Sequence, residues 1–394
     1  AESYSEPMLV IAPDPASARD IEEDLRLFGL DGVVSYPPDE ILPYDYHDPD
    51  RDLTGLQMKA LEALLEGRCR ALVCTLRSAL KKVFPPGLFK ELLVGIRRGE
   101  ERDPIELAEE LTDLGYERHE IVEAKGQFAL RGGILDIFEV GEEGPVRMEF
   151  DGDEIFSMRN FDIETQRSTC DRDGLRVRPL RHLVLKSDGL RKLRRRIEQD
   201  ASGMDRKDRA RMMLPVERLE SGISFFGMEH YAAAVHDVAP IFSYFKSEPL
   251  VVYFDAEDLE TMAEDFREEI ERRYERTRDE GHLYPSPAEA YTTEEELRKL
   301  LGESRRLYFR KLGWEGAIRF GSSAPGDYRR NLGGLLKDIK KELDAGMSVF
   351  LLCANTFQRD RAEEVLSDVA LEVDFPVGGL SIGFRWPEVG VVFL

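Results

Sequence analysis

Cysteine and long apolar runs are scarce in this sequence, and each shortage excludes a class of protein. The 394 residues include only four cysteines, Cys69, Cys74, Cys170 and Cys353, which are too scattered for a disulfide framework or a zinc site. No apolar run approaches the length of about 18 residues that a membrane span needs. The first seven residues have neither the basic start nor the apolar stretch of a signal peptide. The sequence therefore predicts a cytoplasmic protein with reduced thiols and no membrane partner.

The sequence also lacks the motifs of the common catalytic sites. No Gly-Lys pair occurs, so the phosphate-binding loop G-x-x-x-x-G-K-[ST] is absent, and we do not expect this chain to hydrolyse ATP. There is no G-x-S-x-G elbow, no cysteine has the context of a nucleophile, and the six histidines show no metal-ligand spacing. We therefore expect no catalytic residue, no metal and no cofactor.

Basic residues are in the minority, with 55 Lys and Arg against 78 Asp and Glu, and the net charge of -23 opposes non-specific binding to nucleic acid. Residues 176–211 are an exception, with 13 basic and five acidic residues, whereas residues 255–280 hold 12 acids and five arginines. Two interpretations are open. The basic segment is a solvated helix paired with the acidic one, or it contacts nucleic acid through Arg191, Lys192, Arg194 and Arg195.

Alternating strand and helix patterns predict an α/β domain at the beginning of the chain. The predicted elements are a buried strand at 9–13, a capped amphipathic helix at 16–28, a helix at 53–66 and a second buried strand at 70–75. Strands that alternate with helices pair in parallel. A further strand at 250–254, followed by a long charged helix, is expected to belong to the same domain.

Between these segments the pattern indicates a small α+β insert. One helix, 104–114, is followed by short strands separated by glycine turns, which is typical of an antiparallel meander. The predicted strands are 117–124, 128–131, 134–139, 146–150 and 154–161.

The end of the chain again has an α/β pattern, with helices at 332–343 and 356–366 and strands at 348–353 and 390–394. Two prolines at 285 and 287 favour a linker before it. The chain opens without Met and stops within the apolar run 391–394, so we expect it to be a piece of a longer protein.

The insert carries long motifs that can be compared with known families. They are Gly126 to Phe138 (GQFALRGGILDIF), Pro145 to Ile155 (PVRMEFDGDEI) and Arg159 to Asp162 (RNFD), with Gln166-Arg167-Ser168 after them. They closely resemble the insert shared by the excision-repair protein UvrB and the transcription-repair coupling factors. Glu40 to Asp45 (EILPYD) is similar to the family's E-x-L-P-Y-D, and Gly222 to Tyr231 is similar to its G-I-E-x-Y segment. The likeness covers about residues 9–280 and is greater to the coupling factors, since UvrB would also carry a phosphate loop.

The resemblance implies a fold and a division into domains. The fold would be a degenerate helicase-lobe-like α/β domain with a parallel sheet, an inserted α+β domain with an antiparallel sheet, and a small C-terminal α/β domain. The expected boundaries are 1–90 and 178–284 for the lobe, 91–177 for the UvrA-binding insert, 285–305 for a linker and 306–394 for the small domain.

The resemblance also implies a function, that of a catalytically silent module that recruits UvrA. UvrA contacts carry over to Arg131 and Arg147, with Phe150 and Asp151 beside them. Asp151 stands where the family usually has a second Phe, and Glu139 replaces the family's usual Pro. The full-length parent would be an ATP-dependent DNA translocase that binds double-stranded DNA and releases stalled RNA polymerase. The alternatives are a UvrB-like DNA-dependent ATPase or helicase subunit, and a DNA-binding module that uses residues 176–211.

Overall fold

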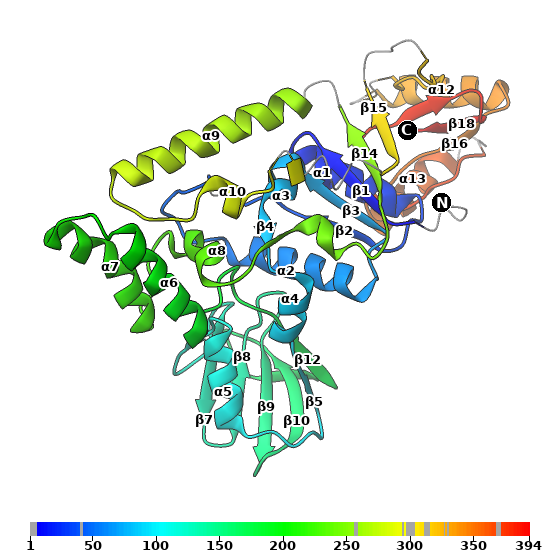
Figure 1. Cartoon of the computed structure of the whole chain (residues 1–394). Helices are drawn as coiled ribbons and strands as arrows, with labels where there is room; N and C mark the ends of the chain where they lie inside the picture. The colour runs from blue at the N-terminus through cyan, green and yellow to red at the C-terminus, as the bar shows by residue number, and fades with distance from the viewer. Residues whose placement is uncertain are drawn as a thin grey trace.

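A five-stranded parallel sheet forms the core of the first lobe in the computed structural model of the chain (Figure 1). The structure describes residues 6–39, 42–255, 259–293, 295–296, 304–310, 316–326, 328, 331–367 and 372–394. Every neighbouring pair of strands is parallel, in the order β15-β14-β1-β3-β2. The strands are β1 (Met8–Ala12), β2 (Val33–Tyr36), β3 (Ala71–Thr75), β14 (Leu250–Phe254) and β15 (Arg306–Phe309).

Helices cover both faces of this sheet, which explains why its strands are apolar at nearly every position. Leu9 and Ile11 pack in one core with α2 (Arg51–Glu66), and Val10 and Ala12 pack in another with α1 (Pro15–Leu27). The predicted parallel sheet is therefore confirmed. Helices α3 (Leu76–Leu80), α4 (Pro86–Leu92) and α9 (Leu259–Asp279) complete the lobe with the short strands β4 (Lys82–Val83) and β13 (Ala239–Pro240).

The insert is a six-stranded sheet in the order β11-β10-β9-β8-β7-β6, with α5 (Pro104–Asp113) against it (Figure 1). Its strands are β6 (Glu117–Arg118), β7 (Gln127–Arg131), β8 (Ile134–Ile137), β9 (Val146–Asp151), β10 (Glu154–Phe161) and β11 (Ser168–Asp171). From β7 to β10 the sheet is the predicted antiparallel meander. Strand β11, which was not predicted, extends it by pairing antiparallel with β10.

One predicted strand of the insert, 117–124, is wrong in length and direction. Only β6 forms, and it pairs in parallel with β7. The Gln127 side chain accepts hydrogen bonds from the backbone N–H groups of Glu123 and Ala124, and Gly126 has a positive φ of 83°. The chain therefore loops back toward β7 before a longer strand can form.

The insert joins the lobe through paired entry and exit strands and a buried charge cluster. Strand β5 (Val94–Arg97) pairs antiparallel with β12 (Gly174–Val177). Just after β12, Arg178 donates to Glu62 of α2 at 2.7 Å and to Glu139 at 3.0 Å. All three side chains are at least nine-tenths buried. Burial raises the pKa of Glu139, against the lowering effect of Arg178.

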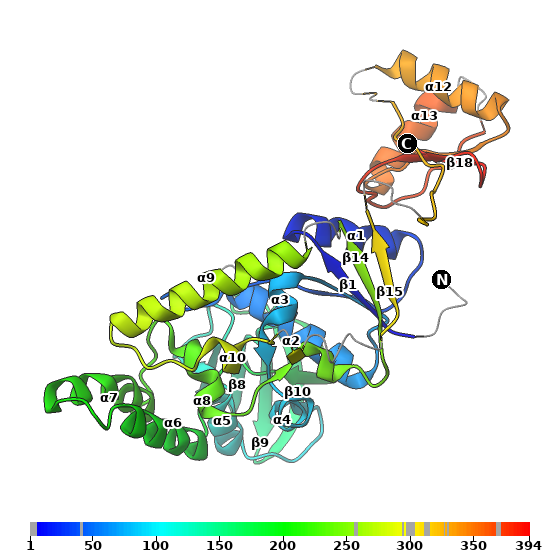
Figure 2. The same cartoon turned by 45° about the horizontal axis from the view of Figure 1, so that its top comes forward.

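The basic segment forms two packed helices, α6 (Ser187–Asp200) and α7 (Arg206–Glu220), at one end of the lobe (Figure 2). Its predicted partner is not the one found. Arginines of α6 form ion pairs with Glu220 of α7 and Glu289 of α10 (Pro287–Ala290), and among the described residues none pairs with a carboxylate of α9. Complementary charge counts do not determine which helices meet. Helix α8 (Ala232–Val235) and two 3-10 turns, 228–231 and 241–244, follow.

The predicted boundary at 306 needs a correction, because Arg306 to Phe309 is strand β15 of the first sheet. The apolar residues Leu307 and Phe309 continue the parallel pairing next to β14. The segment proposed as a linker also packs on the lobe where it is described, since Thr292 is buried and the Tyr44 hydroxyl donates to the Pro285 carbonyl at 2.9 Å. We place the start of the last unit after Phe309.

The last unit is a three-stranded sheet in the order β16-β18-β17 with two helices. Its elements are α12 (Leu332–Asp344), β16 (Ser348–Phe350), α13 (Thr356–Ser367), β17 (Phe384–Trp386) and β18 (Val391–Phe393). It contacts α1, since the Ser381 hydroxyl donates to the Asp24 carboxylate at 2.6 Å and Phe28 packs on the ring of Phe393.

No helix among the described residues is both long and apolar enough to cross a membrane. The four cysteines are free thiols, three buried and Cys170 exposed. Burial raises the pKa of the Cys69 thiol to about 12. Glu40 and Ile41 of the EILPYD motif, and residues 256–258 after β14, lie outside the described residues.

Candidate protein-docking interface

Two of the predicted contact residues, Arg131 and Arg147, meet on one face of the insert sheet at Asp136. Arg131 Nη2 lies 2.7 Å from Asp136 Oδ2. Arg147 donates from Nε to Asp136 Oδ1 at 2.7 Å and from Nη2 to Oδ2 at 2.9 Å, a bidentate pair. Asp136 is fully buried, so its charge is compensated by the two guanidinium groups above it.

The arrangement follows from strand register. Asp136 of β8 stands directly opposite Ala129 of β7 on one side and Arg147 of β9 on the other. Ala129 is itself buried in a small cluster with Phe138 and Phe161, and Arg131, two residues along the same strand, lies on the same face. The sequence analysis did not single out Asp136. An acid within the apolar run Ile134-Leu135-Asp136-Ile137 is nonetheless a signal, since a buried carboxylate needs a basic partner.

The two arginines differ in what they can offer a partner protein. Arg147 is largely buried, donates from Nη1 to the Gln166 carbonyl at 3.1 Å and lies over the ring of Phe161. Its hydrogen bonds to Asp136 raise its pKa. Arg131 has 45% of its side chain exposed, and Asp136 is its only ion-pair partner within the described residues. Arg131 is therefore the freer donor, and Arg147 is held in place.

Phe150 does not join this face. Side chains alternate along β9, so Arg147, Glu149 and Asp151 share one face, and Met148 and Phe150 point to the other. Phe150 is buried in the core shared with α5, whereas Asp151 is exposed at the end of the strand. We therefore place Asp151, and not the Phe150 side chain, beside the arginines.

A third arginine, Arg159 of β10, was not predicted from the sequence. It stands directly opposite Arg147 in the sheet, has 44% of its side chain exposed, and pairs with Asp171 of β11 at 3.2 Å. Carboxylates thus flank the neighbouring pair Arg147 and Arg159, with Asp136 beside Arg147 and Asp171 beside Arg159. We call Arg131, Arg147 and Arg159 the arginine face.

The four basic residues proposed for nucleic acid lie on α6, which follows the insert in the sequence and is not part of its sheet. Arg191 pairs with Asp188, and Arg194 with Glu220. Lys192 and Arg195 are exposed and form no ion pair with any of the residues that the structure describes. The structure thus leaves two of the four free for an anionic partner.

The position at which α/β folds often hold a phosphate, the N-terminus of the helix after the first strand, is filled by a side chain. The Asp14 carboxylate accepts hydrogen bonds from the backbone N–H groups of Ala16 at 2.8 Å and Ser17 at 2.9 Å. The Ser17 hydroxyl donates to the other carboxylate oxygen at 2.8 Å. A phosphate placed there would compete with a negatively charged cap.

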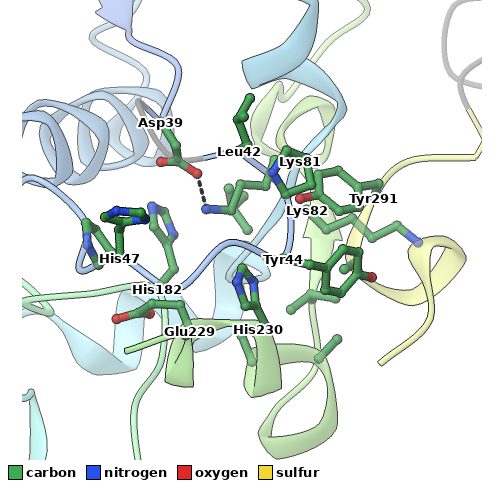
Figure 3. Close-up of a pocket in the computed structure, with 18 residues that line it drawn as sticks. Asp39, Leu42, Tyr44, His47, Lys81, Lys82, His182, Glu229, His230 and Tyr291 are labelled. Atoms are coloured by element: carbon green, nitrogen blue, oxygen red, sulfur yellow. Dashed lines mark hydrogen bonds and ion pairs between the residues drawn. The ribbon is translucent and has the colours of Figure 1, made fainter. Parts of the chain in front are cut away.

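A small cavity of about 80 Å³ lies beside the end of α3, where many titratable side chains converge (Figure 3). Lys81 forms an ion pair with Asp39, which offsets the effect of burial and lowers the pKa of Asp39 to about 2. Gln57 donates to Asp39 at 2.9 Å and accepts from His182 at 2.8 Å, so we assign the proton of that imidazole to Nε2. Burial lowers the pKa of His182 to about 3.

The side chains around this cavity form a polar cluster in which most members bind each other, as in a structural site. Burial raises the pKa of Glu229 to about 7, although Arg181 lies 3.3 Å away. Within the described part of the chain, no three His, Cys, Asp or Glu side chains are grouped as metal ligands. The main partners in this cluster, Asp39 with Lys81 and Gln57 with His182, are bound to each other.

This chain is similar to known proteins both within the insert and over most of its remaining length. A family model described as the UvrB interaction domain matches residues 94–183. The transcription-repair-coupling factor of Myxococcus xanthus is 30% identical over 318 residues, which cover 76% of this chain and 26% of the relative. That of Escherichia coli is 26% identical, covering 70% of this chain and 24% of the relative. That of Bacillus subtilis is 21% identical, and the match covers 94% of this chain and 33% of the relative.

This chain thus spans about a quarter to a third of the length of these relatives. The matches cover both the lobe and the insert, and the most extensive of them covers nearly the whole chain. The chain therefore belongs to the transcription-repair-coupling factor family, as its N-terminal region with the UvrB interaction domain.

Proposed function

We propose that this chain is a docking module that recruits the repair protein UvrA through the arginine face of its insert. The observation that carries the proposal is the exposed guanidinium of Arg131, held above the buried Asp136 next to Arg147. Arginine forks bind carboxylates in a bidentate manner, so the proposed partner surface is acidic. The match of residues 94–183 to an interaction domain supports the same role.

We propose that Arg131 and Arg159 make the direct contacts, because both are almost half exposed. Arg147 would act mainly by keeping Asp136 neutralised and the sheet face flat. This division refines the expectation from the sequence, in which Arg131 and Arg147 have equal roles.

We further propose that the chain is catalytically silent. The support is the absence of a Gly-Lys pair from the sequence and the presence of the Asp14 carboxylate at the N-terminus of α1. The alternative, a UvrB-like DNA-dependent ATPase, predicts ATP turnover that DNA stimulates. A coupled ATPase assay on this chain, with and without DNA, separates the two.

For the full-length parent we propose an ATP-dependent DNA translocase that releases stalled RNA polymerase in the bacterial cytoplasm. The name of the relatives, transcription-repair-coupling factor, supports this assignment. In such a protein, this region would pass the lesion on to the repair machinery by binding UvrA.

The decisive experiment is a calorimetric titration of this chain with purified UvrA. We expect Arg131→Ala to weaken binding about tenfold or more, since a lost charge-assisted hydrogen bond is worth about 1.5–3 kcal/mol. Arg195→Ala on α6 is the matched control, because it removes an exposed arginine outside the insert. No binding by the folded wild-type chain, or equal losses from both substitutions, would contradict the proposal.

A further inference from the structure

A concave surface lies between α7 and the segment that follows α9. Its residues belong to the lobe and not to the insert that carries the arginine face. It has a volume of about 590 Å³, within the range of about 300–1,000 Å³ typical of ligand sites. Helix α7 forms one wall, and Tyr46, His282 and Tyr284 form the opposite wall. We call this surface the α7 groove.

The walls of the α7 groove are fixed by contacts within the chain. Arg211 donates to the Glu280 carbonyl at 2.7 Å, and the Tyr46 hydroxyl donates to the Glu280 carboxylate at 3.2 Å. The rings of His282 and Tyr284 stack with centroids 5.4 Å apart. Gly227 has a positive φ, and a Cβ there would meet the Tyr284 hydroxyl at 3.0 Å. The groove is therefore formed before any partner arrives.

Large apolar side chains stand exposed along its rim. Leu214 of α7 is 50% exposed and Phe226 is 64% exposed, and both line the groove. Ile223, in the loop between them, is 55% exposed. Its backbone N–H donates to the Arg218 carbonyl at 2.8 Å, which is the hydrogen bond of a Schellman motif at the end of α7. In that motif the apolar residue at this position usually packs against the last turn of the helix, whereas Ile223 is exposed. Clustered exposure of this kind marks a binding surface.

Two arginines bracket these apolar residues on the same side of α7. Arg211 and Arg218 are seven residues apart, which is two helical turns or about 10 Å. Both are exposed, and neither has an ion-pair partner among the described residues. The nearest acid of the lining, Asp48, is exposed on the opposite wall. Arg211 is held by the Glu280 carbonyl and Arg218 lies over the ring of Phe225. The groove thus offers an apolar centre between two positioned guanidinium groups that have no carboxylate partner among the described residues.

We propose that the α7 groove docks a short acidic segment of a partner protein, in which one or two large apolar residues lie between two carboxylates about 10 Å apart. In a polyproline-II segment, which has three residues per turn and rises about 3.1 Å per residue, residues i and i+3 lie on the same side about 9 Å apart and match this spacing. The carboxylates pair with Arg211 and Arg218, and the apolar residues cover Leu214 and Phe226. A phosphate backbone fits less well, because the chain carries a net charge of -23, which opposes its approach.

The test uses the whole chain and an array of short synthetic peptides with the pattern acid, apolar, apolar, acid, in all combinations of Leu, Ile, Phe and Trp. Matched arrays replace the acids with Lys or the apolar pair with Gly-Ser. We expect binding by the acidic apolar array alone. Arg218→Glu should weaken the best peptide at least about tenfold, the effect of losing one charged pair.

Arg209→Glu is the matched control, because it makes the same charge change on α7 at an exposed residue outside the groove. Phe226→Ser is a second variant at a residue so exposed that folding should not depend on it, and it should also weaken binding about tenfold. Circular dichroism checks the fold of each variant.

Three outcomes would overturn the proposal. They are equal binding of the Lys and acidic arrays, loss of binding in Arg209→Glu as large as in Arg218→Glu, and no binding to any array. Titration with single-stranded oligonucleotides and sedimentation over a range of protein concentrations test the other occupants. Binding of DNA, or dimerisation, that Phe226→Ser abolishes would replace the acidic segment with that occupant.

Discussion

Arg178 donates to Glu62 at 2.7 Å, and this buried ion pair ties the end of the insert to helix α2 of the lobe. On its other side Arg178 bonds to Glu139, the residue that replaces the family's usual Pro. One guanidinium thus bonds to two buried carboxylates at the junction of the two units. The orientation of the arginine face relative to the lobe depends on this junction.

Substitution Arg178→Met should destabilise the protein by about 3–5 kcal/mol, because it leaves the buried Glu139 without a counter-ion and Glu62 with only its longer contact to Arg176. Urea unfolding followed by circular dichroism measures the change. Arg176→Met is the control, since Arg176 is 44% exposed and its contacts with Glu62 and Glu66 are longer, at 3.6 and 3.4 Å. It should cost no more than about 1 kcal/mol. Similar losses for the two variants would show that the buried cluster has no special role.

A second prediction concerns Gly55 of α2, where helix and insert come closest. A Cβ at this position would lie 2.1 Å from the Val140 carbonyl oxygen, so Gly55→Ala must push the insert away from α2. We expect a loss of about 2 kcal/mol or more, as for other overpacked sites, and faster hydrogen exchange at Val140 and Gly141. Gly87→Ala, where a Cβ meets nothing within 4 Å, should be neutral or slightly stabilising. Unchanged exchange in Gly55→Ala would contradict this account.

A third prediction concerns the pH dependence of Glu229. Burial raises its pKa from 4.5 to about 7, so between these values the folded protein holds a proton that the unfolded chain has lost. This carboxyl therefore lowers the free energy of unfolding as the pH rises from 4.5 to 7, by about 3 kcal/mol if it acts alone. Glu229→Gln should remove that loss, so its stability relative to the wild type should increase across this window.

Neighbouring histidines act in the opposite direction and are present in both proteins. Burial lowers the pKa of His182 to about 3 and that of His230 to about 4, below the unfolded value of 6.5. They stabilise the folded state at neutral pH and lose that effect as the pH falls. The measurement is therefore the difference between wild type and Glu229→Gln in urea midpoints from pH 4.5 to 7. A constant difference would refute the assignment.

The parallel sheet was predictable because its strands are short, continuous apolar runs. Leu9 to Ala12 and Leu72 to Cys74 are buried on both faces, and such runs between amphipathic helices leave little choice of fold. Strand β15 was missed because it is short and lies at the edge of the sheet, so Arg306 and Tyr308 alternate with apolar residues instead of forming a continuous apolar run. The same alternation would also fit a strand of an isolated hairpin. Only the tertiary pairing with β14 identifies it.

The predicted contact residues Arg131 and Arg147 lie in strands of the insert, as expected from the sequence, but their contacts were not predictable. Arg131 and Arg147 came from a resemblance to known motifs, which does not say which arginine is buried. Asp136, Arg159 and the burial of Phe150 depend on register and on which face of β9 meets α5. A shift of one residue would exchange the two faces. The helix that pairs with α6 was predicted wrongly because charge counts contain no geometry.

Asp151 gives the last prediction, which bears on the proposed UvrA contact. It is exposed at the end of β9, on the same face as Arg147, where the family usually has a second Phe. An acid here weakens a surface that would attract carboxylates, and an aromatic residue would supply an apolar anchor beside the arginines. Asp151→Phe should therefore tighten UvrA binding about tenfold in calorimetric titration. Asp153→Phe, an exposed residue in the adjacent turn, is the control for non-specific adhesion. If both substitutions tighten binding equally, or neither does, the anchor does not lie at Asp151. A gain confined to Asp151→Phe would mean that this chain retains the partner site and differs from its relatives in affinity.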